Sequence, residues 1–221
     1  MKKSNYFLLS ALIGLFSCTP SRVVRPLEKG QKTVSAHLGG PLIGFAGTTI
    51  PIPFTTVHYA QGITNKTTLF GSVHTTSLLF GVFQTDIGAC QQIYFHDSLR
   101  VGLSVNPALN IAFDKWEKQL KCWPQLDINA YWEIKSKKSF LYAGVENWFE
   151  LAAYKAHAIT QQKHWLIAPQ LGYTYVREKW NYNFETKYMA PTIANTPNVV
   201  DYRGIAGKGA IGVYISFTRK F

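Results

Sequence analysis

The sequence predicts an all-β fold, a transmembrane antiparallel up-and-down β-barrel of about ten strands, with eight strands as a variant. After residue 30, segments of about 9–14 residues alternate apolar and polar side chains, and a tilted membrane strand needs about 9–11 residues. Tyr, Phe and Trp account for 12, 14 and 6 of the 221 residues, and aromatic side chains favour strands. Charged residues are only 16%, which argues against a disordered chain or a coiled coil.

The first 20 residues predict export. A basic start, Met1–Lys3, precedes an apolar stretch, Tyr6–Phe16, which is too short to span a bilayer but typical of a secretory signal. The following Leu15–Cys18 resembles a bacterial lipobox, with Leu at −3, a small residue at −1 and Cys at +1, although Phe at −2 is larger than usual. The resemblance implies a signal peptide over 1–17 and a lipid on Cys18. An ordinary signal peptide with an incidental cysteine is the alternative.

Residues 18–30 are predicted to form a lipidated tether before a barrel over 31–221, because they contain Pro26 and three basic residues between 21 and 30. Cys90 and Cys122 remain for pairing in an oxidising compartment. They fall in segments expected at opposite barrel ends, so two separate thiols are favoured over a disulfide. Their spacing matches no metal motif.

Ten segments with strand character follow, at 31–40, 53–61, 67–75, 79–89, 98–106, 124–135, 139–151, 164–177, 180–189 and 209–221. The sixth segment alternates clearly. Ile128 and Trp132 share one face, and Asp127 and Asn129 share the other. The apolar face is predicted to meet lipid. The polar face, rich in Gly, Asn, Tyr and scattered charge, is typical of a barrel lumen.

The connections alternate in length. Four odd-numbered connections are long, at 40–52, 107–123, 152–163 and 190–208. The third, at 76–78, is short where length is expected. Three even-numbered connections are short, at 62–66, 136–138 and 178–179, and the fourth, 90–97, is intermediate. Long loops at one end and short turns at the other predict a barrel with its termini at the periplasmic end. Residues 113–121 are the one stretch expected to form a helical turn.

The last ten residues support this location. Ile211, Val213, Phe217 and Phe221 fall on one parity of the final segment. This pattern is similar to the C-terminal signal strand of bacterial outer-membrane β-barrel proteins. The resemblance implies an outer-membrane location and recognition by the outer-membrane assembly machinery. Arg219 falls on the same apolar side and is expected at the membrane interface.

A polar cluster is predicted in the lumen, where side chains largely fill a narrow barrel and buried charges must pair. Its candidates are His37, His58, His74, Asp86, Arg100, Asp127, Glu133, Glu146, Glu185 and Lys187. Further acidic and basic candidates on the same parity are Glu150 and Lys220. The favoured interpretation is a salt-bridged plug with no catalytic residue and no metal. A carboxylate pair acting as general acid and base is the sharper alternative, and a surface His-Asp site is another, drawn from Asp114, His157, His164 and Asp201.

The chain carries 23 basic and 12 acidic residues, a formal charge of +11, and loss of residues 1–17 leaves 21 basic residues and a charge of +9. The basic residues are dispersed, which argues against nucleic-acid binding. The expected partners are membrane lipids, lipopolysaccharide and the assembly machinery, with no cofactor. The expected function is structural or surface-interaction work by a lipid-anchored outer-membrane barrel. The alternatives are a small-solute channel, a barrel enzyme acting on lipid or peptide, and a soluble lipocalin-like lipoprotein.

Overall fold

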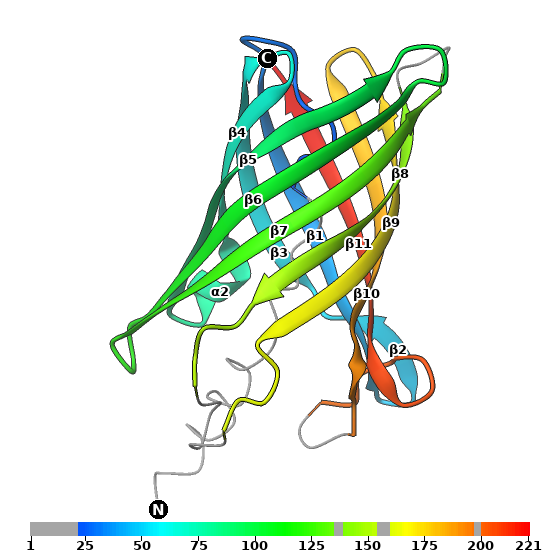
Figure 1. Ribbon diagram of the computed structural model, residues 1–221. Coiled ribbons are helices and arrows are strands. Elements are labelled where there is room, and N and C mark those ends of the chain that lie inside the picture. The colour runs from blue at the N-terminus through cyan, green and yellow to red at the C-terminus, as the bar shows by residue number, and fades with distance from the viewer. Residues whose placement is uncertain (1–21, 135–138, 154–159, 197–199) are drawn as a thin grey trace, which may run out of the picture.

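The computed structural model describes residues 22–134, 139–153, 160–196 and 200–221 (Figure 1). The predicted signal peptide and Cys18 lie outside the described residues. Ten strands form a closed antiparallel barrel, because the first strand pairs with the last. The elements are β1 (Lys32–Phe45), β2 (Thr48–Pro51), β3 (Phe54–Thr64), β4 (Thr67–His74), α2 (Thr75–Leu79), β5 (Val82–His96), β6 (Val101–Asp114), β7 (Gln119–Glu133), β8 (Phe140–Phe149), β9 (Trp165–Val176), β10 (Trp180–Ala194) and β11 (Lys208–Lys220).

Strand β1 closes the barrel. Its residue Ala36 is paired with Val57 of β3 on one side and with Phe217 of β11 on the other. Each remaining barrel strand pairs with its sequence neighbour. The short β2 pairs only with the far end of β1 and extends that strand as a hairpin. Closure pairs the backbone groups along most of the wall, as a lipid environment requires, and the exception is one end of the β9–β10 pairing.

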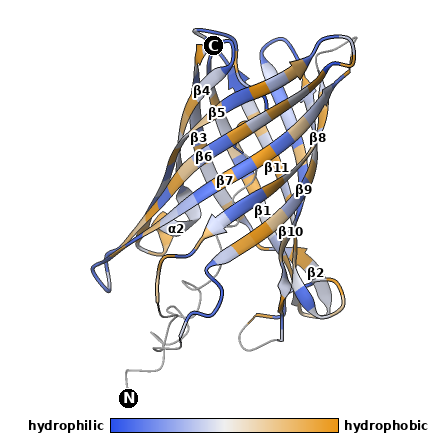
Figure 2. Ribbon diagram, viewed as in Figure 1, coloured by the Kyte–Doolittle hydropathy of each residue, from blue (hydrophilic) through white to orange (hydrophobic). Residues whose placement is uncertain are grey.

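The outer face of the barrel is apolar, and the alternation along each strand is visible in Figure 2. Ile128, Trp132 and Phe184, expected to face lipid, are 45%, 43% and 58% exposed. Their strand neighbours Asp127 and Glu185 are 1% and 3% exposed and lie inside. An apolar outer face around a polar interior is the arrangement of a membrane barrel. In the described part of the chain, no helix is long and apolar enough to cross a membrane.

The prediction of ten barrel strands is confirmed, but several strands are longer than predicted. Residues 107–123, expected as a loop, continue β6 and β7 as a paired hairpin. The helical turn expected within 113–121 is wrong, since Lys115–Lys118 form the hairpin turn between the two strands. The predicted loop 40–52 is likewise mostly hairpin. These extensions carry mixed side chains because they leave the lipid belt, so they lack the strong alternation of the membrane segments.

Two lumen tyrosines explain two glycines in the wall. Tyr131 is paired with Gly102 of β6, and Tyr142 is paired with Gly172 of β9. A Cβ atom at either glycine would overlap the ring of its tyrosine. The bare backbone therefore lets each ring lie flat inside the barrel, where both tyrosines are fully buried.

Candidate functional site: an ion-paired lumen filled by the N-terminal segment

The interior of the barrel contains part of its own chain. The segment Arg22–Gly30, expected as a tether, bonds to the wall, with Arg22–Leu27 inside the barrel and Glu28–Gly30 exposed at the short-turn end. The Leu27 amide donates to Thr68 Oγ1 at 2.8 Å, and Ser104 Oγ donates to the Val24 carbonyl at 2.5 Å. These contacts use the backbone of the segment, so its path is fixed at several points.

The segment follows the barrel axis. The Lys29 amide bonds to Asn65 Oδ1 in the turn between β3 and β4, at the end that holds the C-terminus. Arg22 contacts Asp86, whose strand β5 begins only four residues earlier, at the long-loop end. The described segment therefore runs from Gly30 at the short-turn end to Arg22, deeper in the lumen and nearer the long loops.

Arg22 is the central cation of the lumen. Its guanidinium lies 2.8 Å from Asp86 Oδ1 and 3.7 Å from Asp127 Oδ2, and it also donates to Gln125 Oε1. The side chain is 3% exposed, and those of Asp86 and Asp127 are 0% and 1% exposed. Charges buried to this degree require such partners, because their lost hydration is otherwise uncompensated.

Asp86 binds more than the arginine. Its Oδ2 accepts a hydrogen bond from Ser72 Oγ at 2.6 Å and lies 2.7 Å from His74 Nε2. Its Oδ1 accepts from Asn110 Nδ2 at 2.6 Å as well as from Arg22. This carboxylate thus joins the N-terminal segment to three strands, β4, β5 and β6.

A second ionic group lies on the neighbouring part of the wall. Lys187 Nζ is 2.6 Å from Glu146 Oε2 and 3.7 Å from Glu185 Oε1. Tyr142 donates its hydroxyl to Glu185 Oε2 at 2.5 Å. Asp127 and Glu146 are directly opposite each other on β7 and β8. The two groups therefore form one chain of charges across the lumen.

A third ionic group lies nearer the short-turn end and is less buried. Arg25 Nη1 is 2.9 Å from Glu133 Oε1, and Arg100 contacts the other oxygen of that carboxylate. Arg25 also lies 4.8 Å from the centre of the Phe140 ring. The segment is thus held at two levels by two arginines.

The three predicted histidines are all buried in the lumen. The rings of His37 and His58 are 5.6 Å apart, and His58 lies 5.4 Å from Phe70. His74 is turned toward Asp86 instead. Among the described residues, no group of three or more His, Cys, Asp or Glu side chains is arranged to hold a metal ion.

The surface His-Asp candidates are engaged locally. Asp201 pairs with Arg203, and Asp114 accepts hydrogen bonds from the backbone of its own hairpin turn. His164 bonds to the Glu150 carbonyl. No contact joins these side chains to one another in the described part of the chain, and His157 lies outside it.

The described cysteines are both free. Cys90 is fully buried on β5 and lies 3.8 Å from the Val24 carbonyl, against the N-terminal segment. Cys122 is on β7, paired in register with Ile111 near the long-loop end. The favoured prediction of two separate thiols agrees with this geometry.

Arg22 and Arg25 are the residues that the sequence interpretation missed. A basic, proline-containing stretch gives no strand periodicity, so nothing placed it inside the barrel. The signal that was present is charge balance. Among the predicted lumen residues the acids outnumber Lys and Arg, and buried acids need cations from elsewhere in the chain.

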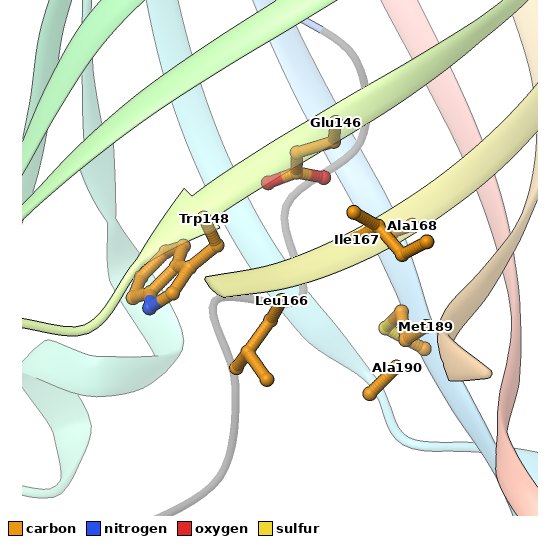
Figure 3. Close-up of a pocket in the computed structure, with 7 residues that line it drawn as sticks. All are labelled: Glu146, Trp148, Leu166, Ile167, Ala168, Met189 and Ala190. Carbon is orange, nitrogen blue, oxygen red and sulfur yellow. The ribbon is translucent and has the colours of Figure 1, made fainter. Parts of the chain in front are cut away.

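The barrel wall is incomplete between β9 and β10. Their pairing runs from Val176↔Asn181 to Gln170↔Lys187, and no pairing joins Trp165–Pro169 to Tyr188–Ala194. We call this unpaired stretch the β9–β10 opening. A pocket lies there, shown in Figure 3, lined by Glu146, Trp148, Leu166, Ile167, Ala168, Met189 and Ala190.

A closed ten-strand barrel with an apolar outer face and a polar, filled interior defines this chain as an outer-membrane β-barrel protein. Aromatic residues at the strand ends support this assignment, because they are typical of the membrane interface. At the short-turn end, Arg219 stacks on Trp180 and Phe221.

The solved structures similar to this chain are bacterial barrels. The translocator domain of the autotransporter NalP from Neisseria meningitidis is 11% identical, with 88% of this chain and 90% of that chain covered and a TM-score of 0.46. The transport unit of the autotransporter AIDA-I from Escherichia coli is 10% identical, with coverages of 99% and 97% and a TM-score of 0.42. OprG from Pseudomonas aeruginosa is 12% identical, with coverages of 90% and 99% and a TM-score of 0.31. No family model and no curated protein matches the sequence. The fold assignment therefore depends on strand register and surface alone.

Proposed function

We propose that this protein is a lipid-anchored barrel of the bacterial outer membrane with a structural or surface-interaction role, and that Cys18 carries the lipid. The observation that supports the proposal best is the occupied lumen. Arg22–Leu27 lies in the interior, and the ionic groups around Arg22 and Lys187 cross it. When the lumen is occupied, partners can contact the loops and the outer face of the barrel rather than its interior.

The small-solute channel is the less favoured alternative. An open pore needs a continuous wet path, whereas Tyr131, Tyr142 and Phe140 form a buried aromatic layer around Val24 at the short-turn end. The enzyme alternative also lacks support. Asp127 and Glu146 are opposed carboxylates, but each has a buried cation nearby, and both are almost completely hidden from solvent.

A soluble lipocalin-like lipoprotein requires the opposite surface. Such a barrel keeps its apolar side chains around an internal ligand cavity. Here the large apolar side chains Leu171, Phe184 and Phe217 are on the outside, 56%, 58% and 46% exposed. The interior contains charges instead.

Lipopolysaccharide is the partner we propose for the long-loop end. The β6–β7 hairpin extends there with Trp116 61% exposed, and Lys115 Nζ lies 4.4 Å from the centre of its ring. Lys118 and Lys121 are on the same hairpin. An exposed tryptophan among lysines suits a headgroup layer that carries phosphate.

Two measurements test the proposal. The full chain, reconstituted in planar bilayers, is expected to give no stepwise conductance, and a steady conductance would support the channel instead. Metabolic labelling with a fatty acid is expected to label the protein and to fail in Cys18→Ala. Cys122→Ala is the matched control and is expected to keep the label, while migration on gels stays heat-modifiable in both variants.

A further inference from the structure

The β9–β10 opening has a specific chemical cause. An Ala-Pro dipeptide borders it on each strand, Ala168-Pro169 on β9 and Ala190-Pro191 on β10. Proline has no backbone N–H and cannot donate to a sheet ladder. Ala190 also has a φ of +47°, so the backbone of β10 bends there. Strand β9 stays paired with β8 in this region, whereas the pairing of β10 with β11 is interrupted between Met189 and Ala194.

The side chains that line the opening are mostly apolar and come from both faces of the wall. Ile167 shares the outward parity of Leu171, whereas Leu166 and Ala168 share the inward parity of Gln170. Met189, only 6% exposed, lies across from them on β10. Of the seven lining residues, Glu146 alone is charged, and its carboxylate is turned toward Lys187.

The described part of the N-terminal segment begins beside this opening. The Arg22 guanidinium lies 3.7 Å from Asp127, and Asp127 is directly opposite Glu146, a residue of the lining. Directly opposed strand residues have Cα atoms about 5 Å apart. Cys18 is four positions before Arg22, and four steps of fully extended chain span at most about 14 Å. Cys18 is thus within reach of the opening.

We propose that the β9–β10 opening holds an acyl chain attached to Cys18, which leads from the lumen through the wall into the outer leaflet of the membrane. The inference depends on the proposed lipid attachment. It extends that proposal by naming where in the barrel the acyl chain binds and which leaflet of the membrane it enters.

Physical chemistry favours this route. An acyl chain left among the charges around Arg22 and Lys187 would be surrounded by polar groups and lumen water, which apolar chains avoid. The opening supplies apolar side chains from the lumen to the outer face. It lies in the part of β9 nearest the long loops, at Trp165–Pro169, and a tryptophan 63% exposed at its start marks the membrane interface.

The test uses cells grown with a fatty acid that carries a photoactivatable diazirine and an alkyne. After illumination of intact cells, cross-linked peptides of the purified full chain are identified by mass spectrometry. Cross-links are expected on the peptides that contain 165–169 and 188–191. They are expected to disappear in Cys18→Ala, which shows that they come from the attached lipid rather than from free lipid around the barrel.

A filling variant sharpens the test. Ala168→Phe places a ring in the opening and is expected to lower the yield of cross-links to 188–191 at least fivefold, while Cys18 stays labelled. Ala143→Phe is the matched control, because Ala143 has outward parity on β8, away from the lining. It is expected to leave the yield unchanged.

The outcomes separate the two proposals. A labelled Cys18 with cross-links elsewhere, for example around Ile128 on β7, overturns the acyl-chain seat and leaves the anchor in place. An unlabelled Cys18 overturns both. Equal cross-link yields in Ala168→Phe and wild type also contradict the seat, provided that both proteins migrate as folded barrels.

Discussion

Two arginine–aspartate pairs in this barrel have almost the same geometry and opposite surroundings. Arg22 lies 2.8 Å from Asp86 with side chains 3% and 0% exposed, and Arg203 lies 3.0 Å from Asp201 with side chains 50% and 43% exposed. Distance therefore does not distinguish them. Water screens the loop pair and can replace either partner, whereas the lumen pair has no such substitute. The buried pair is therefore expected to stabilise the fold, and the exposed pair is expected to contribute little to its stability.

The largest effect is expected from Arg22→Met. The methionine keeps much of the side-chain volume but leaves Asp86 and Asp127 buried without their cation. Removal of one partner from a buried pair costs about 3–5 kcal/mol. The free energy of unfolding, measured by urea titration in lipid vesicles, is expected to fall by about that amount. A loss no larger than that of the loop variant below would contradict the comparison.

A charge on the outer face is expected to lower the free energy of unfolding nearly as much as Arg22→Met does. Leu171→Arg puts a cation on the lipid side of β9, where a charge near the bilayer midplane costs about 2–4 kcal/mol. Ile205→Arg is the matched control, because Ile205 is 57% exposed against 56% for Leu171 but lies in a loop. Equal stability of the two variants in vesicles would argue that Leu171 does not face lipid.

Tyr142→Phe is expected to have a smaller effect. It removes one hydroxyl that donates to Glu185 at 2.5 Å, while Lys187 remains beside that carboxylate. A hydrogen bond to a charged group contributes about 1.5–3 kcal/mol. The free energy of unfolding of this variant, from the same urea titration, should lie between the values for Arg22→Met and wild type. A value equal to that of wild type would mean that water replaces the hydroxyl.

The smallest effect is expected from Arg203→Ala. An exposed ion pair contributes at most about 1 kcal/mol. The same urea titration should scarcely distinguish the variant from wild type, and added salt should remove any difference. A loss above about 2 kcal/mol would show that the loop around Arg203 is structural.

The wall of the barrel could be predicted from the sequence because membrane strands impose a strict period. Side chains such as Ile128 and Asp127 must point in opposite directions when one face meets lipid. Strand ends were less predictable. Outside the membrane this constraint disappears, so the sequence around Trp116 predicts a loop although the backbone of the β6–β7 hairpin continues as strand.

The wall-borne residues of the lumen could also be proposed from parity, but their partners could not. Asp86 and Glu146 are on strands and show the alternation, whereas Arg22 is on a segment with no period at all. Its place depends on contacts with residues more than 60 positions away. The β9–β10 opening was hidden for a related reason. The prolines Pro169 and Pro191 are readable in the sequence, but only the register shows that they face the same break.

The N-terminal segment is part of the folded lumen, and a double-mutant cycle between Arg22→Met and Asp86→Asn tests this most directly. If the two side chains touch, the double variant loses an amount of unfolding free energy that differs from the sum of the two single losses by about 1–3 kcal/mol. The reason is that each single variant leaves the other charged partner uncompensated. If the losses add to within about 0.5 kcal/mol, Arg22 does not contact Asp86, and the segment is not held in the barrel as described.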